Sequence, residues 1–555
     1  MSTLFELLLG FDPAGLHDAA KEWRGLSDGA QCAGNRHRSQ VNGPLRQAKW
    51  EGEDARNAFH TLGRTEQILE IVRVESAAVA LTLDTVADRI HQAQTDLNNA
   101  LHRAEEWGLT VGADGTVNLP PLGKGEQNDP EARSDPARKA LATLRGDVQD
   151  RIDKALAAAK EASDRGSLAL GRLDADVLTR PRAFGSAAET AADVKDVAKD
   201  LGLVGPYIPD NTDPRKAADW WTSLTPEQRS SYLALYPDRI GRLDGLPAAA
   251  RDEANRLALD QELDGLKAGR ASGGGTTSGA YNAREQSLMK LKEQLDAHDT
   301  AAEDKQLFLL GYDAGAYGGD GRAIIAMGNP DTADHTAVLV PGTGTTIDST
   351  PGQLARVDDL REAAKQASKG SGQNVSVISW LGYDAPEVPV LQEPNVSVAG
   401  TTRAEDGAEA LRRFTQGTRV AQGDHHGHLS VLSHSYGTTL VGAAAAGGDG
   451  LGADDVVAIA SPGMTVRRSD QLHVEPGHFW TGRATDDPIE LAAGLSLGAD
   501  PMTDRFGGNN LRVDTSGHSG YWDGGSESLA NQGRIIVGAK PTTVPKEHDS
   551  PLLPP

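Results

Sequence analysis

The sequence has a single cysteine, Cys32, and few aromatic residues, which make up 5% of its 555 residues. One cysteine cannot form an intrachain disulfide, and it excludes a metal site built from several thiolates. Long apolar runs are also missing, since no segment approaches the ~18 apolar residues of a membrane-spanning helix. Positive charge is scarce: 55 Lys and Arg stand against 79 Asp and Glu, a net charge of −24. This balance argues against nucleic acid or an anionic membrane as a general partner, because phosphate groups are bound by Lys and Arg.

The first residues, MSTLFELLLGFDP, hold a short apolar run. A signal peptide would need a basic segment before that run and small residues at a cleavage site, and neither is present. We therefore expect a cytoplasmic protein with no integral membrane segment. Its length is too great for one hydrophobic core and predicts about two to four domains, of α and of α/β class.

Residues 1–110 predict a long helical hairpin. The first helix is expected over Gly15–Lys49, with a break or kink at Gly34 and at Gly43-Pro44. The turn is Trp50-Glu51-Gly52, and the second helix follows over Glu53–Trp107. Apolar residues of the second helix recur mostly at steps of three and four, as in a coiled-coil seam. They are Val79, Val86, Ile90, Ala93, Leu97, Ala100, Ala104 and Trp107.

A two-helix hairpin with Trp-x-Gly at its turn resembles the WXG100 class of type VII secretion substrates. The resemblance implies a helical protein partner that binds through the hairpin. It also implies type VII export as the alternative to a cytoplasmic location. The export signal of that class is Tyr-x-x-x-Asp/Glu directly after the second helix. It is absent there, and the nearest match, Tyr281 to Glu285, lies far downstream.

Two further helical parts are expected before the last domain. Residues 130–200, rich in Ala and charged residues, predict an additional helical segment. Residues 217–300 predict a small helical module, in which Thr225-Pro226 has the residue types that begin a helix. The glycine-rich stretch Arg270–Ala280 predicts a flexible linker inside this part.

Residues 301–540 predict one α/β domain, because short apolar runs alternate with helical segments. The first two runs are joined by a glycine-rich turn and predict an antiparallel hairpin, whereas the later runs are typical of buried parallel strands. The expected strands are Gln306–Tyr312, Arg322–Met327, Ala337–Pro341, Asn374–Ser379, His428–Leu432, Asp455–Ala460, Phe479–Ala484 and Arg534–Val537. The expected helices between them are Leu354–Ser368, Arg403–Gln422 and Tyr436–Ala446. The Pro-rich residues 541–555 are expected to be a disordered tail.

The stretch His428–Ala446, HLSVLSHSYGTTLVGAAAA, has the order strand, tight turn, helix, with a serine in the turn. A nucleophile elbow needs this order, with small residues two positions before and two positions after the serine. Ser433 and Gly437 meet that need around Ser435, although serine replaces the usual first glycine. The N–H of Tyr436 at the helix start can then donate to an oxyanion. The alternative is a serine-rich turn that only caps a helix.

A nucleophile elbow in an α/β sheet requires an acid, and after it a histidine, later in the chain. His518, in the loop SGHSGYWD, is the candidate general base. Asp486 and Asp487 both follow an expected strand, where a carboxylate can hydrogen-bond the histidine and stabilise its protonated form. We favour Asp487 because Pro488 rigidifies its position, and Asp486 is the alternative acid.

The loop VLVPGTGTT after the third expected strand is the predicted source of a second oxyanion donor. Gly342 permits close approach of the backbone, and the N–H of Thr343 is the expected donor. A dinucleotide site is not supported, since a third glycine, an acidic ribose ligand and a P-loop lysine are all missing. We expect no cofactor.

Three other polar groups have structural alternatives. Asp384, after the fourth expected strand, is a candidate pocket residue or an ordinary turn carboxylate. His434, beside the serine, is expected to be a packing residue and not a second base. The run Asp424–His428 precedes a strand and lacks a carboxylate at helical spacing, so we expect no metal site there.

Five motifs together resemble the actinobacterial α/β-hydrolase family DUF1023: VPGTGT, WLGYDAP, SHSYG, ASPGM and GHSGYW. The upstream stretch RLDGLP…RDEANR shares the resemblance, which covers about residues 217–538. It implies an α/β-hydrolase fold with a triad of Ser435, one aspartate of the pair Asp486-Asp487, and His518. It implies no particular substrate.

These observations predict a serine hydrolase that cleaves a carboxylic ester, a lipid ester among the candidates, through an acyl-enzyme. The apolar, Pro-rich loop Glu387–Val398 is a candidate partial lid. The alternative is a partner-binding protein or type VII secretion effector in which the hairpin is the functional part and the hydrolase fold is a scaffold.

Overall fold

The computed structural model describes residues 3–48, 50, 53–120, 136–173, 187–201, 208–271, 279–299, 301–369, 371–387 and 397–547. The chain divides into two compact units. One consists of residues 1–35 and 63–206, and the other of residues 36–62 and 207–555. Of the predicted turn Trp50-Glu51-Gly52, only Trp50 lies within the described residues.

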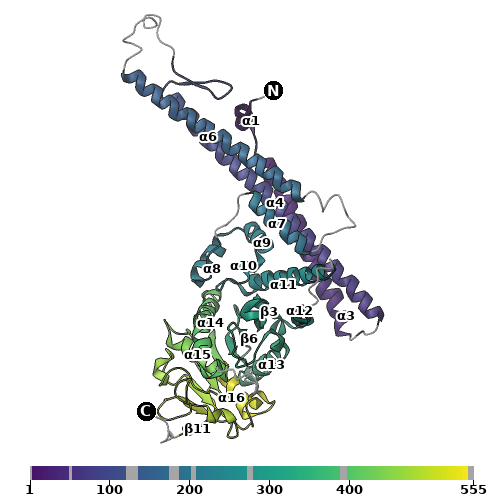
Figure 1. Cartoon of the computed structure of the whole chain (residues 1–555), viewed down its shortest axis with the longest axis vertical. Helices are drawn as coiled ribbons and strands as arrows, with labels where there is room; N and C mark the ends of the chain where they lie inside the picture. Colours follow the sequence, from purple (N-terminus) through teal and green to yellow (C-terminus); the bar gives the residue numbers. More distant parts are fainter. Residues whose placement is uncertain are drawn as a thin grey trace, which may run out of the picture. The chain divides into compact units, whose positions relative to one another are not determined.

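The first unit is built from long helices (Figure 1). Its elements are α1 (Leu4–Gly10), most of α2 (Ala14–His37), most of α4 (Glu53–Glu106), α6 (Pro136–Leu173) and α7 (Ala187–Asp200), with a small hairpin of β1 (Thr110–Val111) and β2 (Val117–Asn118). The apolar stripe of α4 packs against α1 and α6, and Leu97 and Ile152 are fully buried in this core. Arg24 of α2 forms an ion pair with Asp84 of α4. Among the described residues, none of the helices has the length and apolar character of a membrane span.

The predicted second helix of the hairpin is confirmed almost to the residue. The first helix continues through Gly34, where a break was also expected, and is interrupted next to Gly43-Pro44 as predicted. After α2 the backbone forms a π-helix, η1 (Arg38–Asn42), and then the short α3 (Gly43–Gln47). Pro44 has no N–H to donate and its ring clashes with the preceding turn, which explains why the break falls at this point. The additional helical segment expected at 130–200 corresponds to α6 and α7, and residues 130–135 and 174–186 lie outside the described part.

In the second unit a helical module precedes the sheet. It contains α8 (Pro214–Ser223), α9 (Pro226–Leu235), α10 (Pro237–Ile240), α11 (Ala248–Ala271) and α12 (Gly279–His298). Thr225 caps α9 as predicted, since its hydroxyl accepts from the Gln228 N–H while the Gln228 side chain accepts from the Thr225 N–H. The ends of the predicted linker belong to α11 and α12, and residues 272–278 lie outside the described part.

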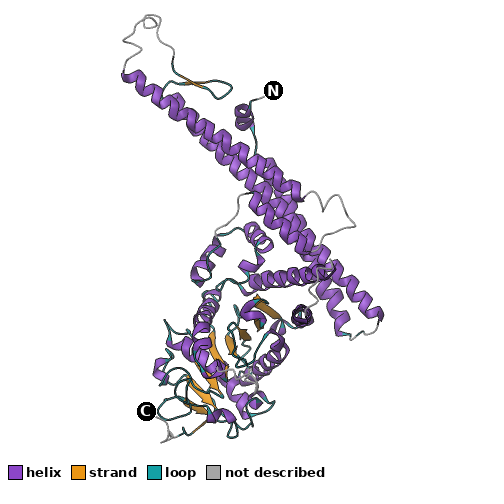
Figure 2. Cartoon of the chain, viewed as in Figure 1, coloured by secondary structure: helices purple, strands orange, loops and turns teal. Residues whose placement is uncertain are grey.

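Nine strands form one mixed sheet (Figure 2). They are β3 (Leu307–Asp313), β4 (Arg322–Met327), β5 (His335–Val340), β6 (Val375–Leu381), β7 (His428–His434), β8 (Asp455–Ile459), β9 (Phe479–Gly482), β10 (Asn509–Leu511) and β11 (Thr543–Val544). The strand order is β11-β10-β9-β8-β7-β5-β6-β4-β3. The central strands from β6 to β10 are parallel, and β3, β4 and β11 pair antiparallel. This is the predicted α/β-hydrolase architecture.

Helices cover both faces of the sheet, so the central strands are buried on both sides. One face carries α13 (Thr350–Ala367) and α16 (Glu527–Ile536), and the other carries α14 (Thr402–Ala421) and α15 (Tyr436–Ala446). Alternate residues of β5 enter the two cores, with Leu339 in the first and Val338 in the second. Short 3-10 turns complete the unit: η2 (Glu303–Lys305), η3 (Ala316–Gly319), η4 (Ile347–Ser349), η5 (Ser397–Ala399), η6 (Ser469–Gln471), η7 (Pro488–Leu491) and η8 (Gly520–Trp522).

Two expectations at the end of the chain were wrong. The run Arg534–Val537 is not a strand: Arg534–Ile536 is the last turn of α16, whose apolar side is buried against α13. A run of only three apolar residues cannot distinguish a buried helix face from a strand. The sheet continues instead through β10, which is short and polar, and through β11. Because β11 lies at Thr543–Val544, the expected disordered tail does not begin at residue 541.

Candidate active site

Ser435 occupies the sharp turn between β7 and α15. Its backbone angles, φ 54° and ψ −131°, are rarely adopted by a residue with a side chain and cost on the order of 1–3 kcal/mol. The surrounding structure enforces them, because the Ser435 N–H donates to the Ile459 carbonyl at 3.0 Å. A Cβ atom at Gly437 would lie 2.6 Å from the carbonyl oxygens of Val340 and Pro341, so glycine is required there. The strand, turn and helix predicted for an elbow are therefore all present.

His518 lies between Ser435 and Asp487. Its Nε2 atom is 2.9 Å from the Ser435 Oγ, and its Nδ1 atom is 2.9 and 3.0 Å from the two Asp487 carboxylate oxygens. The Asp487 side chain is fully buried, whereas the His518 side chain is about one-third exposed. A proton on Nδ1 donates to the carboxylate, which leaves Nε2 as the acceptor for the serine hydroxyl proton. This geometry can remove a proton from Ser435.

Two further groups satisfy the buried carboxylate of Asp487. The Ile489 N–H donates to one oxygen at 2.9 Å, and the Tyr521 hydroxyl donates to the other. The Tyr521 oxygen in turn accepts from the Ala484 N–H at 3.0 Å. Burial, with the neighbouring Asp487 as a further cause, raises the pKa of Tyr521 above its usual value, so the hydroxyl keeps its proton and remains a donor. Tyr521 was missed in the sequence, although it lies three residues after His518 in GHSGYW.

The other two aspartate candidates contact different groups. Asp486 is exposed, and its carboxylate accepts from the Gly517 N–H at 2.8 Å. It therefore holds the loop that carries His518 but does not contact the imidazole. Asp384 forms an ion pair with Arg403. Of the aspartates proposed from the sequence, the structure brings Asp487 to His518.

The loop after β5 passes directly against the nucleophile. A Cβ atom at Gly342 would lie 2.7 Å from the Ser435 Cβ and 3.3 Å from its Oγ, so this backbone approach requires glycine. The Thr345 hydroxyl donates to the Gly342 carbonyl at 2.8 Å, and the Gly344 N–H donates to Pro386 at 2.8 Å. These bonds fix the loop that carries the Thr343 N–H.

The other expected oxyanion donor, the Tyr436 N–H, is at the start of α15. As the first residue of the helix, Tyr436 has no intrahelical acceptor for its N–H. Its side chain is anchored separately, because the hydroxyl donates to the Gly400 carbonyl at 2.6 Å.

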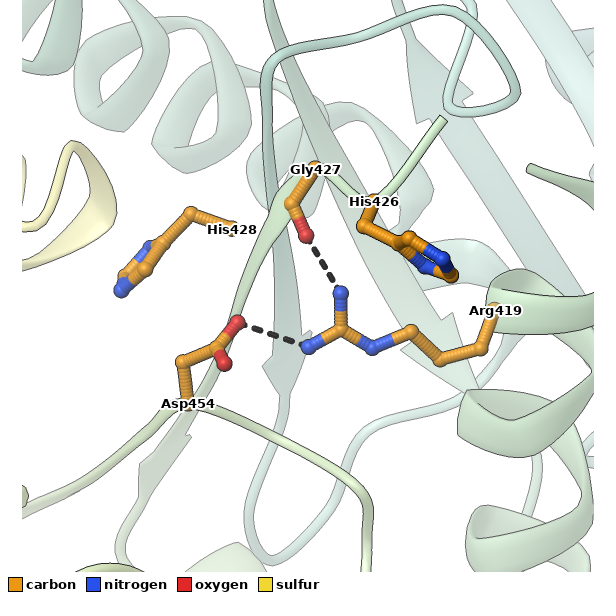
Figure 3. Close-up of a pocket in the computed structure, with 5 residues that line it drawn as sticks. All are labelled: Arg419, His426, Gly427, His428 and Asp454. Atoms are coloured by element: carbon orange, nitrogen blue, oxygen red, sulfur yellow. Dashed lines mark hydrogen bonds and ion pairs between the residues drawn. The ribbon is translucent and has the colours of Figure 1, made fainter. Parts of the chain in front are cut away.

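An open pocket of about 430 Å³ lies at the His428 end of β7, opposite to the end that leads to Ser435. It is lined by Arg419, His426, Gly427, His428 and Asp454 (Figure 3). Arg419 donates to the Gly427 carbonyl and to Asp454, the latter at 2.7 Å. His428 lies 2.9 Å from Asp455 through Nε2 and 3.0 Å from the Ile536 carbonyl through Nδ1. Within the described ranges, no three His, Cys, Asp or Glu side chains are grouped so that they could hold a metal ion.

Comparison with known proteins agrees with this fold. An α/β hydrolase family model matches residues 318–497, a range that includes Ser435 and Asp487 but not His518. The uncharacterized protein Rv2079 of Mycobacterium tuberculosis is 32% identical over 366 residues, which are 58% of this chain and 55% of the relative. The uncharacterized protein Mb0988c of Mycobacterium bovis is 30% identical over 218 residues, which are 36% of this chain and 73% of the relative. The chain thus spans about half the length of the first of these relatives.

Proposed function

The chain belongs to this α/β hydrolase family, and from that membership we propose that it is a serine hydrolase of carboxylic esters that acts through an acyl-enzyme. The observation that carries the proposal is the position of His518, whose two ring nitrogens lie within hydrogen-bond distance of Ser435 and Asp487. Ion-pair networks also bring histidine and aspartate together, but they do not place a serine hydroxyl on a strained elbow at the other nitrogen.

In the proposed reaction the Ser435 Oγ attacks the ester carbonyl while His518 Nε2 takes its proton. Asp487 stabilises the imidazolium that forms. The N–H groups of Tyr436 and Thr343 donate to the oxyanion, where one donor is worth about 10²–10³ in kcat. His518 then gives its proton to the leaving alkoxide, and a water activated by the same histidine hydrolyses the acyl-enzyme.

Exposed apolar residues that follow Asp487 closely in the chain support an ester with an aliphatic chain, as in a lipid. Leu491 and Leu495 are 83% and 65% exposed, the highest values among the large hydrophobic residues that the structure describes. On the same segment Ala493 and Leu497 are buried. The segment thus has buried and exposed apolar residues, and the exposed leucines offer an aliphatic chain an apolar surface four and eight positions after the acid in the chain. The predicted lid Glu387–Val398 lies mostly outside the described residues and stays a prediction.

A fluorophosphonate probe tests the proposal, because it reacts with a serine that a neighbouring base has activated. We expect labelling of the wild type and none of Ser435→Ala. The matched control is Ser433→Ala, since the Ser433 hydroxyl donates to the Val457 carbonyl and takes no part in the reaction. A folded wild-type protein that takes no label would overturn the mechanism.

A second candidate function is partner binding by the helical hairpin, in the manner of WXG100 proteins. In this case the protein is exported by a type VII system as an effector. Large apolar side chains on the surface of the first unit support it: Leu4, Leu7, Leu9, Leu26, Trp107 and Leu168. The test is detection of the protein in the culture medium of a host with and without a type VII system. Strict retention in the cells would leave the cytoplasmic location.

A further inference from the structure

His434, the residue before the nucleophile, lies directly against His518. Its Nε2 atom is 2.7 Å from the main-chain carbonyl oxygen of His518. A carbonyl oxygen can only accept, so His434 carries a proton on Nε2 and donates it. The side chain is buried at the end of β7, the same strand that leads into the elbow. The contact therefore joins the strand of the nucleophile to the loop of the base.

His518 needs such support because it lies on an irregular loop between β10 and η8. The loop is held at two successive residues. The Gly517 N–H donates to Asp486, and the His518 carbonyl accepts from His434. Together these bonds hold the peptide unit before the Gly517 Cα and the peptide unit after the His518 Cα, and so they restrict the direction in which the imidazole leaves the backbone.

The ring of His434 also supports the ring of His518. The two ring centroids are 4.8 Å apart, and the Trp522 ring packs edge-on against His434 at 5.0 Å. The Arg356 guanidinium lies over the Trp522 ring, 4.3 Å from its centroid. Burial, followed by the neighbouring His518, lowers the pKa of His434 to about 3. His434 therefore stays neutral when His518 takes a proton, and it keeps the tautomer that donates to the carbonyl.

We propose that His434 is a positioning residue for His518: its Nε2–H holds the His518 carbonyl and its ring supports the imidazole, so that Nε2 stays within reach of Ser435. The proposal rests on the proposed hydrolase function. It differs from a packing role, because packing requires a ring of this size but no donor at a defined atom. A displacement of about 1 Å of a reacting group can cost about 10² in rate, so a small shift of His518 has a measurable effect.

Three substitutions separate the two roles. In His434→Gln the side-chain amide reaches about as far as the lost Nε2–H, whereas in His434→Asn the amide ends near the position of Nδ1. His434→Phe keeps the ring and removes the donor. We expect the Asn and Phe variants to lose about 10- to 100-fold in kcat with KM within about twofold, and the Gln variant to stay within about fivefold of wild type. The rate of fluorophosphonate labelling should fall in the same order.

Thermal unfolding of each variant gives the control for stability. Equal kcat values for the Gln and Asn variants, or full activity of the Phe variant, would overturn the positioning role of His434. The hydrolase function would still stand in that case, provided that the wild type takes the label. If the Phe variant does not fold, the comparison of Gln with Asn still decides. A folded wild type without label would overturn the hydrolase function and this proposal with it.

Discussion

The Tyr521 hydroxyl bridges the Asp487 carboxylate and the main-chain N–H of Ala484. Asp487 follows β9, whereas Tyr521 lies in η8, directly after the loop that carries His518. One hydroxyl therefore ties the loop of the acid to the loop of the base, and it does so without contacting the serine. Several expected effects follow from this and neighbouring contacts.

Tyr521→Phe removes one hydrogen-bond donor from the Asp487 carboxylate. The carboxylate then becomes a stronger acceptor for the His518 Nδ1–H and stabilises the imidazolium more. We expect the acid limb of the kcat/KM profile to move to higher pH by a few tenths to about one unit. The Ala484 N–H loses its acceptor as well, so the free energy of unfolding should fall by about 1–3 kcal/mol. A pH–rate profile and a urea titration measure both effects, and an unmoved acid limb would speak against the bridge.

Asp487→Asn and Asp486→Asn form a matched pair of neighbouring substitutions. An amide at 487 cannot hold His518 in the required tautomer, and we expect kcat to fall by about 10³–10⁴. An amide oxygen at 486 can still accept from the Gly517 N–H, so that variant should stay within about tenfold of wild type. Steady-state kinetics on one soluble ester compares the two. A larger loss in the Asp486 variant would assign the acid role to Asp486.

The order nucleophile, acid, base could be predicted from the sequence because the carboxyl ends of the parallel strands all lie at one edge of the sheet. Few polar residues occupy those ends. The sequence favoured Asp487 over Asp486 only through the rigidity of Pro488, since both follow the same strand and the turn geometry decides which carboxylate is buried. β10 is three residues long and begins with two asparagines, so no apolar run revealed it. The proposed role of His434 could not be predicted either, because a histidine that only packs in the core and a histidine that donates a hydrogen bond look the same in the sequence.

Gly342→Ala tests the close approach of the oxyanion loop. Its Cβ would lie 2.8 Å from the His434 carbonyl oxygen and even closer to the Ser435 Cβ, so the loop must shift away from the nucleophile. We expect a fall of about 10²–10³ in kcat, the worth of one oxyanion donor. Gly352→Ala is the control, because an added Cβ there meets no atom within 4 Å and alanine favours the α13 helix. Equal activity of the two variants would exclude the loop after β5 from the site.

Buried, neutral His434 predicts a pH dependence of stability. Burial, followed by the neighbouring His518 and Arg356, lowers its folded-state pKa to about 3, while the hydrogen bond to the His518 carbonyl and the Asp487 carboxylate act in the opposite direction. Its unfolded pKa is about 6.5, so its stabilising contribution is complete above that pH and is lost as the pH falls toward 3. Between pH 7 and pH 5 the loss amounts to about 2 kcal/mol.

The measurement is the free energy of unfolding at pH 7 and pH 5 for wild type and two variants. His434→Phe should lack this part of the loss, while His426→Phe, at an exposed histidine, should keep it. If wild type and His434→Phe lose the same free energy between the two pH values, His434 is not held neutral by the fold.

Leu491 and Leu495 predict a preference for esters with long acyl chains. A fully buried CH₂ group contributes about 0.8 kcal/mol, which corresponds to about a fourfold rise in kcat/KM per CH₂ as an upper bound. We expect kcat/KM of the wild type to rise with chain length from acetyl to octanoyl esters. The double variant Leu491→Ser/Leu495→Ser should flatten this rise. Its kcat/KM for the acetyl ester and its rate of probe labelling should stay within about twofold of wild type, since neither leucine is a member of the triad. Leu168→Ser, at an exposed leucine of the first unit, is the control and should keep the wild-type slope. An unchanged slope in the double variant would show that this surface does not contact the acyl chain, and an activity confined to acetyl esters would exclude lipid esters as substrates.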